Sequence, residues 1–285
     1  MIKYSDQIAI WLKELGYSHY FYVGGGNIMH LTESLSRYLT GVPVVHEVAA
    51  GIAAEYFNEI SGGKKALALV TAGPGLTNIV TALSGAYLES RELLVIGGQV
   101  KTSDLANGEV RSRGIQEIDG VELVRSTTKA STRLRAPMTA IEFADQIALS
   151  WQPRKGPVFL EVPLDIQAAM VEETKAPELT QLGEQLPCMP VEVLQDIVAR
   201  YNAAKKPILL IGGGVDYATA LALQSRFFSL HIPTMTTYNG ADRIDGDAPY
   251  YLGRPNTWGQ RSANLIIQQA DFILALGTRL GLQQT

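Results

Sequence analysis

Short apolar runs alternate with helix-length amphipathic segments along most of the chain. Before residue 165 each run is followed by glycine, proline or the start of a predicted helix. Apolar runs of this length, separated by amphipathic helices, are typical of buried parallel strands joined by crossover helices. The pattern therefore predicts one α/β domain. We expect its strands at residues 19–23, 42–46, 66–71, 93–100 and 157–162.

The segment 171–189 interrupts this alternation, because it mixes acidic residues with prolines and has no sustained apolar period. We interpret it as a linker between two domains, 1–170 and 190–285. The alternation then resumes, and strands are predicted at 207–213, 232–237 and 271–277. The second domain is short and stops where another crossover is expected. The predicted fold class is α/β, with two three-layer parallel-sheet domains in series, the second a partial Rossmann-like domain.

Composition limits the function classes that come into question. The chain has 285 residues, is 46% hydrophobic and has a net charge of -4, with no run rich in lysine and arginine. Nucleic acid is therefore not an expected partner. The single cysteine, Cys188, excludes an internal disulfide and a multi-cysteine metal site. No export signal is visible, and no apolar stretch approaches the roughly 20 residues that span a bilayer. We expect a cytoplasmic protein with no membrane contact.

Three loops of unusual composition each follow a predicted strand. One is the triplet Gly24–Gly26, one carries His46 and Glu47 before an alanine-rich helix, and one is the turn at 71–75 before the helix that bears Asn78. All three are expected at the carboxyl edge of the sheet, where ligands of open α/β sheets bind. Taken alone, Glu47 is better explained as a first-turn acid that stabilises the helix dipole. The glycines and proline at 71–75 are explained equally by tight-turn geometry.

The glycine triplets do not predict a dinucleotide or triphosphate site. The triplet at 24–26 has neither the Gly-x-Gly-x-x-Gly spacing nor a following Lys-Ser/Thr pair. In the second triplet, 212–214, Tyr217 stands where the third glycine of a dinucleotide motif is needed. A nicotinamide-dependent oxidoreductase is therefore disfavoured.

Six motifs in order resemble the pyrimidine-binding domain of thiamine-diphosphate enzymes: VGGGNIMHL, the HE at 46–47, TAGPGLTN, GGQV, GIQEID and GPVFLEVPLDIQ. The acetolactate synthases are the most similar group within that family. KPILLIGGGV and ADFILALGTRL are similar to the central domain of the same family, so the resemblance covers nearly the whole chain. Against this background Glu47 is predicted to be functional.

The resemblance implies roles for eight residues. Glu47 is expected to hydrogen-bond the aminopyrimidine ring of the cofactor and promote deprotonation of its thiazolium carbon. The other implied roles are Gln99 near the reacting carbon, Gly25, Thr71, Pro74 and Asn78 around the pyrimidine ring, and Gln116 and Lys129 along the substrate channel. No metal ligand is implied in this chain.

The implied activity is carboligation or decarboxylation of a 2-oxo acid such as pyruvate, with a keto sugar left open as acceptor. The cofactors are thiamine diphosphate and Mg²⁺, the latter bound by a diphosphate-binding domain that is not found in these residues. Acetolactate synthases also hold FAD in the central domain, but no FAD site is assigned here. The resemblance further implies a homodimer or homotetramer with the active site across a subunit interface.

We therefore expect a truncated chain that is inactive by itself. The alternative is a non-catalytic nucleotide- or flavin-binding or regulatory relative that lacks the diphosphate-binding domain.

Overall fold

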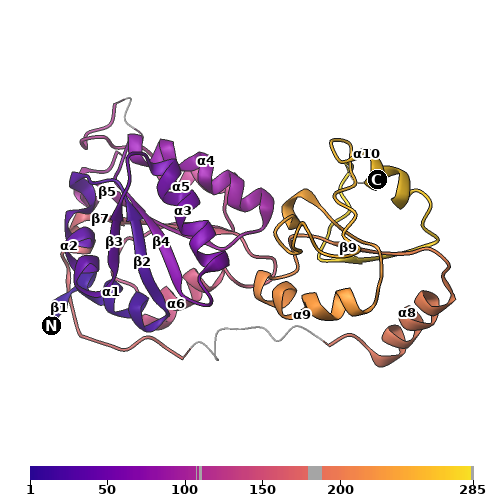
Figure 1. Ribbon diagram of the computed structural model, residues 1–285. Helices are drawn as coiled ribbons and strands as arrows, with labels where there is room; N and C mark the ends of the chain where they lie inside the picture. Colours follow the sequence, from indigo (N-terminus) through magenta and orange to yellow (C-terminus); the bar gives the residue numbers. More distant parts are fainter. Residues whose placement is uncertain (107, 109–110, 179–187, 284–285) are drawn as a thin grey trace. The chain divides into compact units, whose positions relative to one another are not determined.

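A computed structural model describes the chain except for residues 107, 109–110, 179–187 and 284–285. The chain divides into two compact units, Met1–Glu184 and Gln185–Thr285 (Figure 1). Each unit contains a parallel β-sheet with helices packed on it, which confirms the predicted α/β class. None of the helices in the described part of the chain is long and apolar enough to cross a membrane.

The first unit is built on a six-stranded parallel sheet with the order β3-β2-β4-β5-β7-β6. The strands are β2 (Tyr17–Tyr22), β3 (Thr40–Pro43), β4 (Lys65–Val70), β5 (Leu93–Gln99), β6 (Ala130–Arg133) and β7 (Pro157–Pro163). All five predicted strands are present, with ends displaced by up to three residues. The sixth, β6, was not predicted, because its sequence ASTR is polar and only half-buried.

Helices cover both faces of this sheet. They are α1 (Tyr4–Glu14), α2 (Met29–Tyr38), α3 (Glu47–Ile60), α4 (Pro74–Glu89), α5 (Gly120–Val124), α6 (Ala140–Ala148) and α7 (Leu164–Gln167). One apolar core joins the sheet to α1, α2 and α6, and a second joins it to α3 and α4. Figure 1 shows α1 and α2 on one side of the strands and α3 and α4 on the other. This is the predicted three-layer arrangement.

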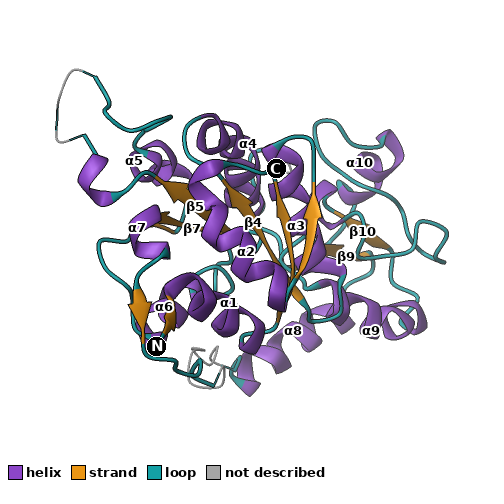
Figure 2. Cartoon of the chain, turned by 90° about the vertical axis from the view of Figure 1, so that its left-hand side faces the viewer, coloured by secondary structure: helices purple, strands orange, loops and turns teal. Residues whose placement is uncertain are grey.

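The chain leaving this sheet stays attached to its first helix. The two-residue strands β1 (Ile2–Lys3) and β8 (Met170–Val171) pair antiparallel beside the N-terminus (Figure 2). Gln7 Nε2 and Trp11 Nε1 then both donate to the backbone oxygen of Thr174, at 2.7 and 3.0 Å. The first residues of the predicted linker therefore pack against α1, while residues 179–187 lie outside the described part.

The second unit has three parallel strands in the order β10-β9-β11. They are β9 (Pro207–Ile211), β10 (Thr234–Thr236) and β11 (Phe272–Leu276), and the helices are α8 (Val191–Ala203), α9 (Tyr217–Ser229) and α10 (Arg261–Ile267). Apolar residues of α10 pack on one face of this sheet, and residues from the ends of α8 and α9 pack on the other. The three strands lie within their predicted ranges, and the helices alternate with them along the chain as the pattern predicts.

Candidate active site

Glu47 lies at the carboxyl edge of the first sheet, because β3 ends just before it and α3 begins with it. His46 caps this helix, its Nδ1 accepting a hydrogen bond from the backbone N–H of Val48 at 3.2 Å. The capping bond satisfies a backbone donor in the first turn of the helix, which begins at Glu47. Val45, two residues before Glu47, is fully exposed, whereas Glu47 itself is only 6% exposed.

The Glu47 carboxylate is held by α4. Asn78 donates from Nδ2 to Glu47 Oε2 at 2.8 Å. The two helices approach closely because Gly51 has no side chain: a Cβ there would lie 2.4 Å from the Cβ of Ala82. The other carboxylate oxygen, Oε1, lies 3.5 Å from the position that a Cβ on Gly75 would occupy, and it accepts no hydrogen bond from any residue that the structure describes. One oxygen is thus fixed and the other is open to a donor.

The turn after β2 lies against the turn after β4. A Cβ on Gly25 would lie 2.4 Å from the Cβ of Thr71, so no larger residue fits at position 25. The backbone N–H of Asn27 donates to Thr71 Oγ1 at 3.3 Å. The backbone oxygen of Asn27 in turn lies where a Cβ on Gly98 would be, only 2.1 Å away. These close approaches interlock the two turns with the end of β5 and bring Gly25 and Thr71 together at the edge that carries Glu47.

Pro74 and Gln116 join this edge through Gly73. Gly73 adopts a left-handed backbone with φ 67° and caps α4, and Pro74 occupies the first turn of that helix. A Cβ on Gly73 would lie 2.7 Å from the Cβ of Gln116, so the loop bearing Gln116 lies directly on this turn. Gln116 itself has a left-handed backbone with φ 60° and an exposed side chain.

Gln99 ends β5 at the same edge, but its side chain points into the protein and is 0% exposed. Its Nε2 donates to the backbone oxygen of Ile118 at 2.8 Å and to Glu161 Oε1 at 3.0 Å. Its Oε1 accepts from the backbone N–H of Val100 at 2.9 Å. The whole amide is therefore engaged inside the protein, which suits a positioning role better than contact with a reacting carbon.

Lys129 lies at the opposite edge of the sheet, because it precedes β6 and its backbone N–H donates to Pro157 at the start of β7. Its Nζ donates to the backbone oxygen of Gln152 at 3.1 Å. Burial, together with the nearby Arg154, lowers the pKa of Lys129. The structure thus separates Lys129 from the other seven predicted site residues within this unit.

Sequence reasoning missed four residues of this edge: Gly98, Asp119, Arg133 and Glu161. Glu161 lies in β7, whose seven residues are all buried, and it bonds both Gln99 and Arg133. A lone carboxylate within an otherwise apolar strand was the available signal, because buried charges need partners. Arg133 could not be predicted as a residue of this edge, because the strand that carries it, β6, was not predicted from the sequence.

The second glycine triplet serves chain packing. A Cβ on Gly212 would lie 2.4 Å from the backbone oxygen of Gly277, and one on Gly213 would lie 2.7 Å from that of Asn239. Gly214 donates from its backbone N–H to the same Gly277 oxygen at 2.8 Å. The triplet lets the loops after the three strands meet, which accounts for it without a bound phosphate.

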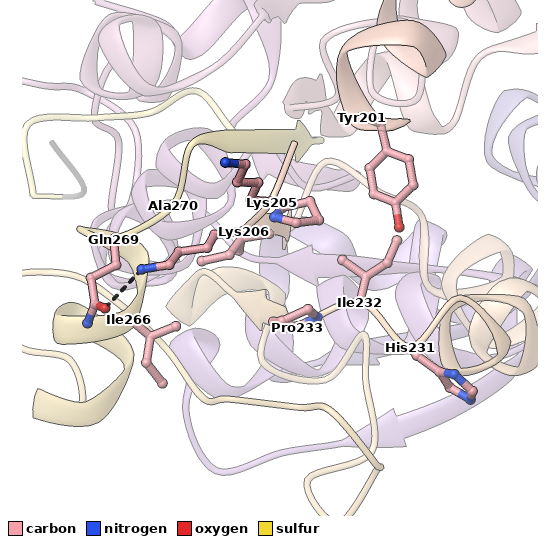
Figure 3. A pocket seen from close by; sticks show the side chains of 11 residues that line it. Tyr201, Lys205, Lys206, His231, Ile232, Pro233, Ile266, Gln269 and Ala270 are labelled. Atoms are coloured by element: carbon pink, nitrogen blue, oxygen red, sulfur yellow. Dashed lines mark hydrogen bonds between the residues drawn. The ribbon is translucent and has the colours of Figure 1, made fainter. Parts of the chain in front are cut away.

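The second unit also holds a cavity of about 410 Å³ at the amino ends of its strands (Figure 3). Ile208, Ile232 and Ile266 form apolar walls, and Lys206 reaches from Nζ to Gln269 Oε1 at 3.5 Å. Ligands of open α/β sheets bind at the other edge, and none of the predicted site residues lines this cavity. The cavity therefore does not belong to the site that the sequence predicts.

No cluster of three or more His, Cys, Asp or Glu side chains in the described ranges has an arrangement that could hold a metal ion. The edge that carries Glu47 instead offers a fixed carboxylate, tight glycine turns and an amide donor.

Comparison with known proteins identifies the class. Residues 2–123 match the N-terminal TPP binding domain of thiamine pyrophosphate enzymes, and residues 194–285 match their central domain. The chain therefore belongs to the thiamine-pyrophosphate-dependent enzyme family.

Within this family the chain is acetolactate synthase-like. It is 30% identical over 278 residues to the acetolactate synthase isozyme 1 large subunit of Escherichia coli (strain K12), an alignment that covers 96% of this chain and 48% of the relative. It is 32% identical over 278 residues to the isozyme 2 large subunit of the same organism, covering 94% and 48%. The acetolactate synthase large subunit of Lactococcus lactis subsp. lactis (strain IL1403) is 29% identical, with 96% and 48% covered. The chain thus spans about half the length of these curated relatives.

Proposed function

We propose that this chain provides the pyrimidine side of the thiamine-diphosphate site in an acetolactate synthase-like enzyme that carboligates or decarboxylates a 2-oxo acid, with Glu47 as the activating carboxylate. The observation that carries this proposal is the Glu47–Asn78 pair. It leaves one carboxylate oxygen open at the sheet edge, inside the region that matches the TPP binding domain. This half-fixed carboxylate fits a donor on the rim of an aminopyrimidine ring.

When bound, thiamine diphosphate supplies a nucleophilic thiazolium carbon and an electron sink for the substrate. This chain would contribute by holding the pyrimidine ring in place and by holding a proton at the Glu47 carboxyl group. Glu47 Oε1 would share one proton with the pyrimidine ring nitrogen, donating it in the carboxyl form and then accepting from the ring N–H, while Asn78 holds Oε2. A carboxylate fixed in this way loses little orientational freedom when the ring binds.

The turns around Glu47 would shape the pocket for the ring. Gly25 and Thr71 fix the separation of two turns, and Pro74 with Gly73 fixes the start of α4. The exposed Gln116 would face the substrate beside the Gly73 turn. Lys129 would lie away from this pocket, because it stands at the other edge of the sheet.

The remaining parts of the proposal rest on the family. Mg²⁺ and the diphosphate group would be held by a domain outside this chain, contributed across a homodimer or homotetramer interface. Pyruvate is the proposed donor substrate. The central domain is proposed to bind FAD. The protein is proposed to be cytoplasmic.

The test is thiamine-diphosphate-dependent consumption of pyruvate by the intact protein that carries this chain, with Glu47→Gln compared to the wild type. We expect turnover to fall by about 10²- to 10⁴-fold, the usual contribution of a positioned proton-transfer group. Glu59→Gln, at the far end of α3, is the matched control and is expected to leave turnover within about threefold of wild type. Equal activity of Glu47→Gln and wild type would contradict the proposal.

A further inference from the structure

A buried ion pair lies behind the site. Glu161 is the one charged residue of β7 and is 0% exposed. Its Oε2 accepts a hydrogen bond from Arg133 Nε, and its Oε1 accepts from Gln99 Nε2 at 3.0 Å. Burial raises the pKa of Glu161, and the contacts with Arg133 and Gln99 oppose that rise. A charge in this setting persists only when its partners are fixed, so the arrangement is rigid.

The pair is tied to the loop that follows β5. Arg133 donates from a terminal nitrogen to Asp119 Oδ1 at 3.1 Å, and Asp119 caps α5 by accepting from the backbone N–H of Glu122 at 3.0 Å. A Cβ on Gly120 would lie 2.5 Å from Glu161 Oε1, so the backbone of this loop rests directly on the carboxylate. Residues 119 and 120 are thus fixed by the ion pair.

Gln99 connects the ion pair to the backbone of this loop, and the ion pair determines how the Gln99 amide is oriented. Because Glu161 only accepts, the Gln99 amide must turn its Nε2 toward it, and the same nitrogen then donates to the Ile118 oxygen at 2.8 Å. Its oxygen is left to accept from Val100 at 2.9 Å. The carboxylate therefore sets which way the amide faces, and the amide in turn holds residue 118.

The other end of this loop reaches the site. Two residues before Ile118, Gln116 lies against Gly73, with 2.7 Å between its Cβ and the position of a Cβ on Gly73. Gly73 caps the helix that presents Asn78 to Glu47. Residues 116–120 are therefore held between the ion pair and the turn beside the catalytic carboxylate.

We propose that Glu161 is a positioning residue: paired with Arg133, it orients the Gln99 amide and fixes residues 116–120, so that Gln116 is held on the Gly73 turn. Its effect on turnover rests on the proposed function, whereas its effect on the loop does not. The role differs from that of a catalytic residue, because the Glu161 side chain has no exposed surface with which to touch a substrate.

The variant Glu161→Gln tests the direction of these bonds while keeping the shape. One end of the new amide is a donor, so it must face either Arg133 Nε or Gln99 Nε2, both of which are donors as well. If it faces Gln99, that amide must turn over and its hydrogen bond to Ile118 is lost. The expected result is release of residues 116–122 with the sheet intact.

Hydrogen exchange of backbone amides in the 285-residue chain, followed by mass spectrometry, measures this release. We expect exchange in residues 116–122 to accelerate by about tenfold or more in Glu161→Gln, with β4 and β5 unchanged. Glu122→Gln is the matched control, because its exposed carboxylate pairs with the exposed Arg125 and not with the buried Glu161–Arg133 pair, and it is expected to exchange like wild type. Unchanged exchange in Glu161→Gln, or acceleration across the whole unit, would overturn the proposal.

Two further variants extend the test, and the first of them does not depend on how well Glu161→Gln folds. Arg133→Gln removes the bond to Asp119 and should release the same residues. The double variant Glu161→Gln with Gln99→Glu restores a donor facing an acceptor between positions 161 and 99, but it leaves the Ile118 oxygen without the donor that Gln99 supplies, so residues 116–122 should stay released. Failure of Arg133→Gln to release residues 116–122, or full recovery of wild-type exchange in the double variant, would count against the proposed direction of the hydrogen bonds.

Turnover of the intact protein gives the second measurement. In Glu161→Gln we expect kcat/KM for pyruvate to fall by about tenfold or more, while half-saturation by thiamine diphosphate stays within about threefold, because the Glu47–Asn78 hydrogen bond does not involve residues 116–120. Equal losses in both quantities would indicate collapse of the whole edge and refute a positioning role. If the wild type has no thiamine-dependent turnover, the proposed function fails, while the exchange experiment still decides the role of Glu161.

Discussion

The buried carboxyl group of Glu55 predicts that the first unit loses stability as pH rises. Glu55 lies in α3, is 6% exposed, and has Arg91 Nε 3.3 Å from its Oε1. Burial raises its pKa from 4.5 to about 7, against the opposing attraction of Arg91 and with support from the nearby Glu89 and Glu59. Desolvation of the carboxylate outweighs the ion pair here.

The sign follows from proton binding in the two states. Because the folded pKa is the higher one, the folded chain binds more protons than the unfolded chain between pH 4.5 and about 7. The contribution of Glu55 to stability is therefore complete below pH 4.5 and is lost as pH rises through about 7. At about 1.4 kcal/mol for each tenfold change in proton affinity, the loss is at most about 3 kcal/mol.

Glu55→Gln removes the titrating group and keeps an oxygen for Arg91. We expect the variant to be up to about 3 kcal/mol more stable than wild type at pH 8, with the difference vanishing near pH 4.5. Urea unfolding at fixed ionic strength between pH 4.5 and 8 measures this. Tryptophan fluorescence in a Trp258→Phe background reports the first unit, because the other two of the three tryptophans, Trp11 and Trp151, lie there.

Glu33→Gln is the control, because Lys3 and Arg37 lower the pKa of Glu33 and its titration falls below this range. It should leave the slope above pH 5 unchanged. If Glu55→Gln and wild type lose stability in parallel from pH 5 to 8, or if wild type gains stability there, the reasoning about burial is refuted.

Three further substitutions test the geometry of the edge. Gly25→Ala should destabilise the unit by about 1–3 kcal/mol, because its Cβ would lie 2.4 Å from that of Thr71, and adding Thr71→Gly should recover part of the loss in thermal unfolding. Asn78→Asp places two carboxylates together and should lower pyruvate turnover by about tenfold or more; unchanged turnover would show that the contact with Glu47 is idle. Lys129→Met should leave kcat/KM within about threefold of wild type, and a larger loss would place Lys129 in the site after all.

The sequence predicts the strands of the first sheet where burial is complete. β4 and β5 are apolar on both faces, so their composition alone marks them as strands. β6 is an edge strand of four partly exposed residues, and no local property separates it from a loop. Without β6, neither the direction of Arg133 nor the edge at which Lys129 lies could be derived.

The sequence could predict which residues gather at the site, because their place at the sheet edge follows from the direction of the strands before them. Glu47, Thr71 and Gly25 each follow a parallel strand, and parallel strands end at the same edge. The orientation of Gln99 was not predictable, because it depends on Glu161, which is 62 residues further along the chain and one strand across. Local pattern places a residue at an edge, whereas the direction of its side chain is decided by partners that only the folded sheet brings near.

The tight packing of the turns at this edge limits which positions can be varied in directed evolution. Positions 25 and 71 fill one another's space, and the backbone of Asn27 fills the space of a side chain at position 98, so a library that enlarges these positions one at a time would return mostly chains that fold poorly. Ile115 and Gln116 are different, since their side chains are exposed above the Gly73 turn. Substrate preference should thus drift through these two positions, while the turns beneath them change only in compensated pairs.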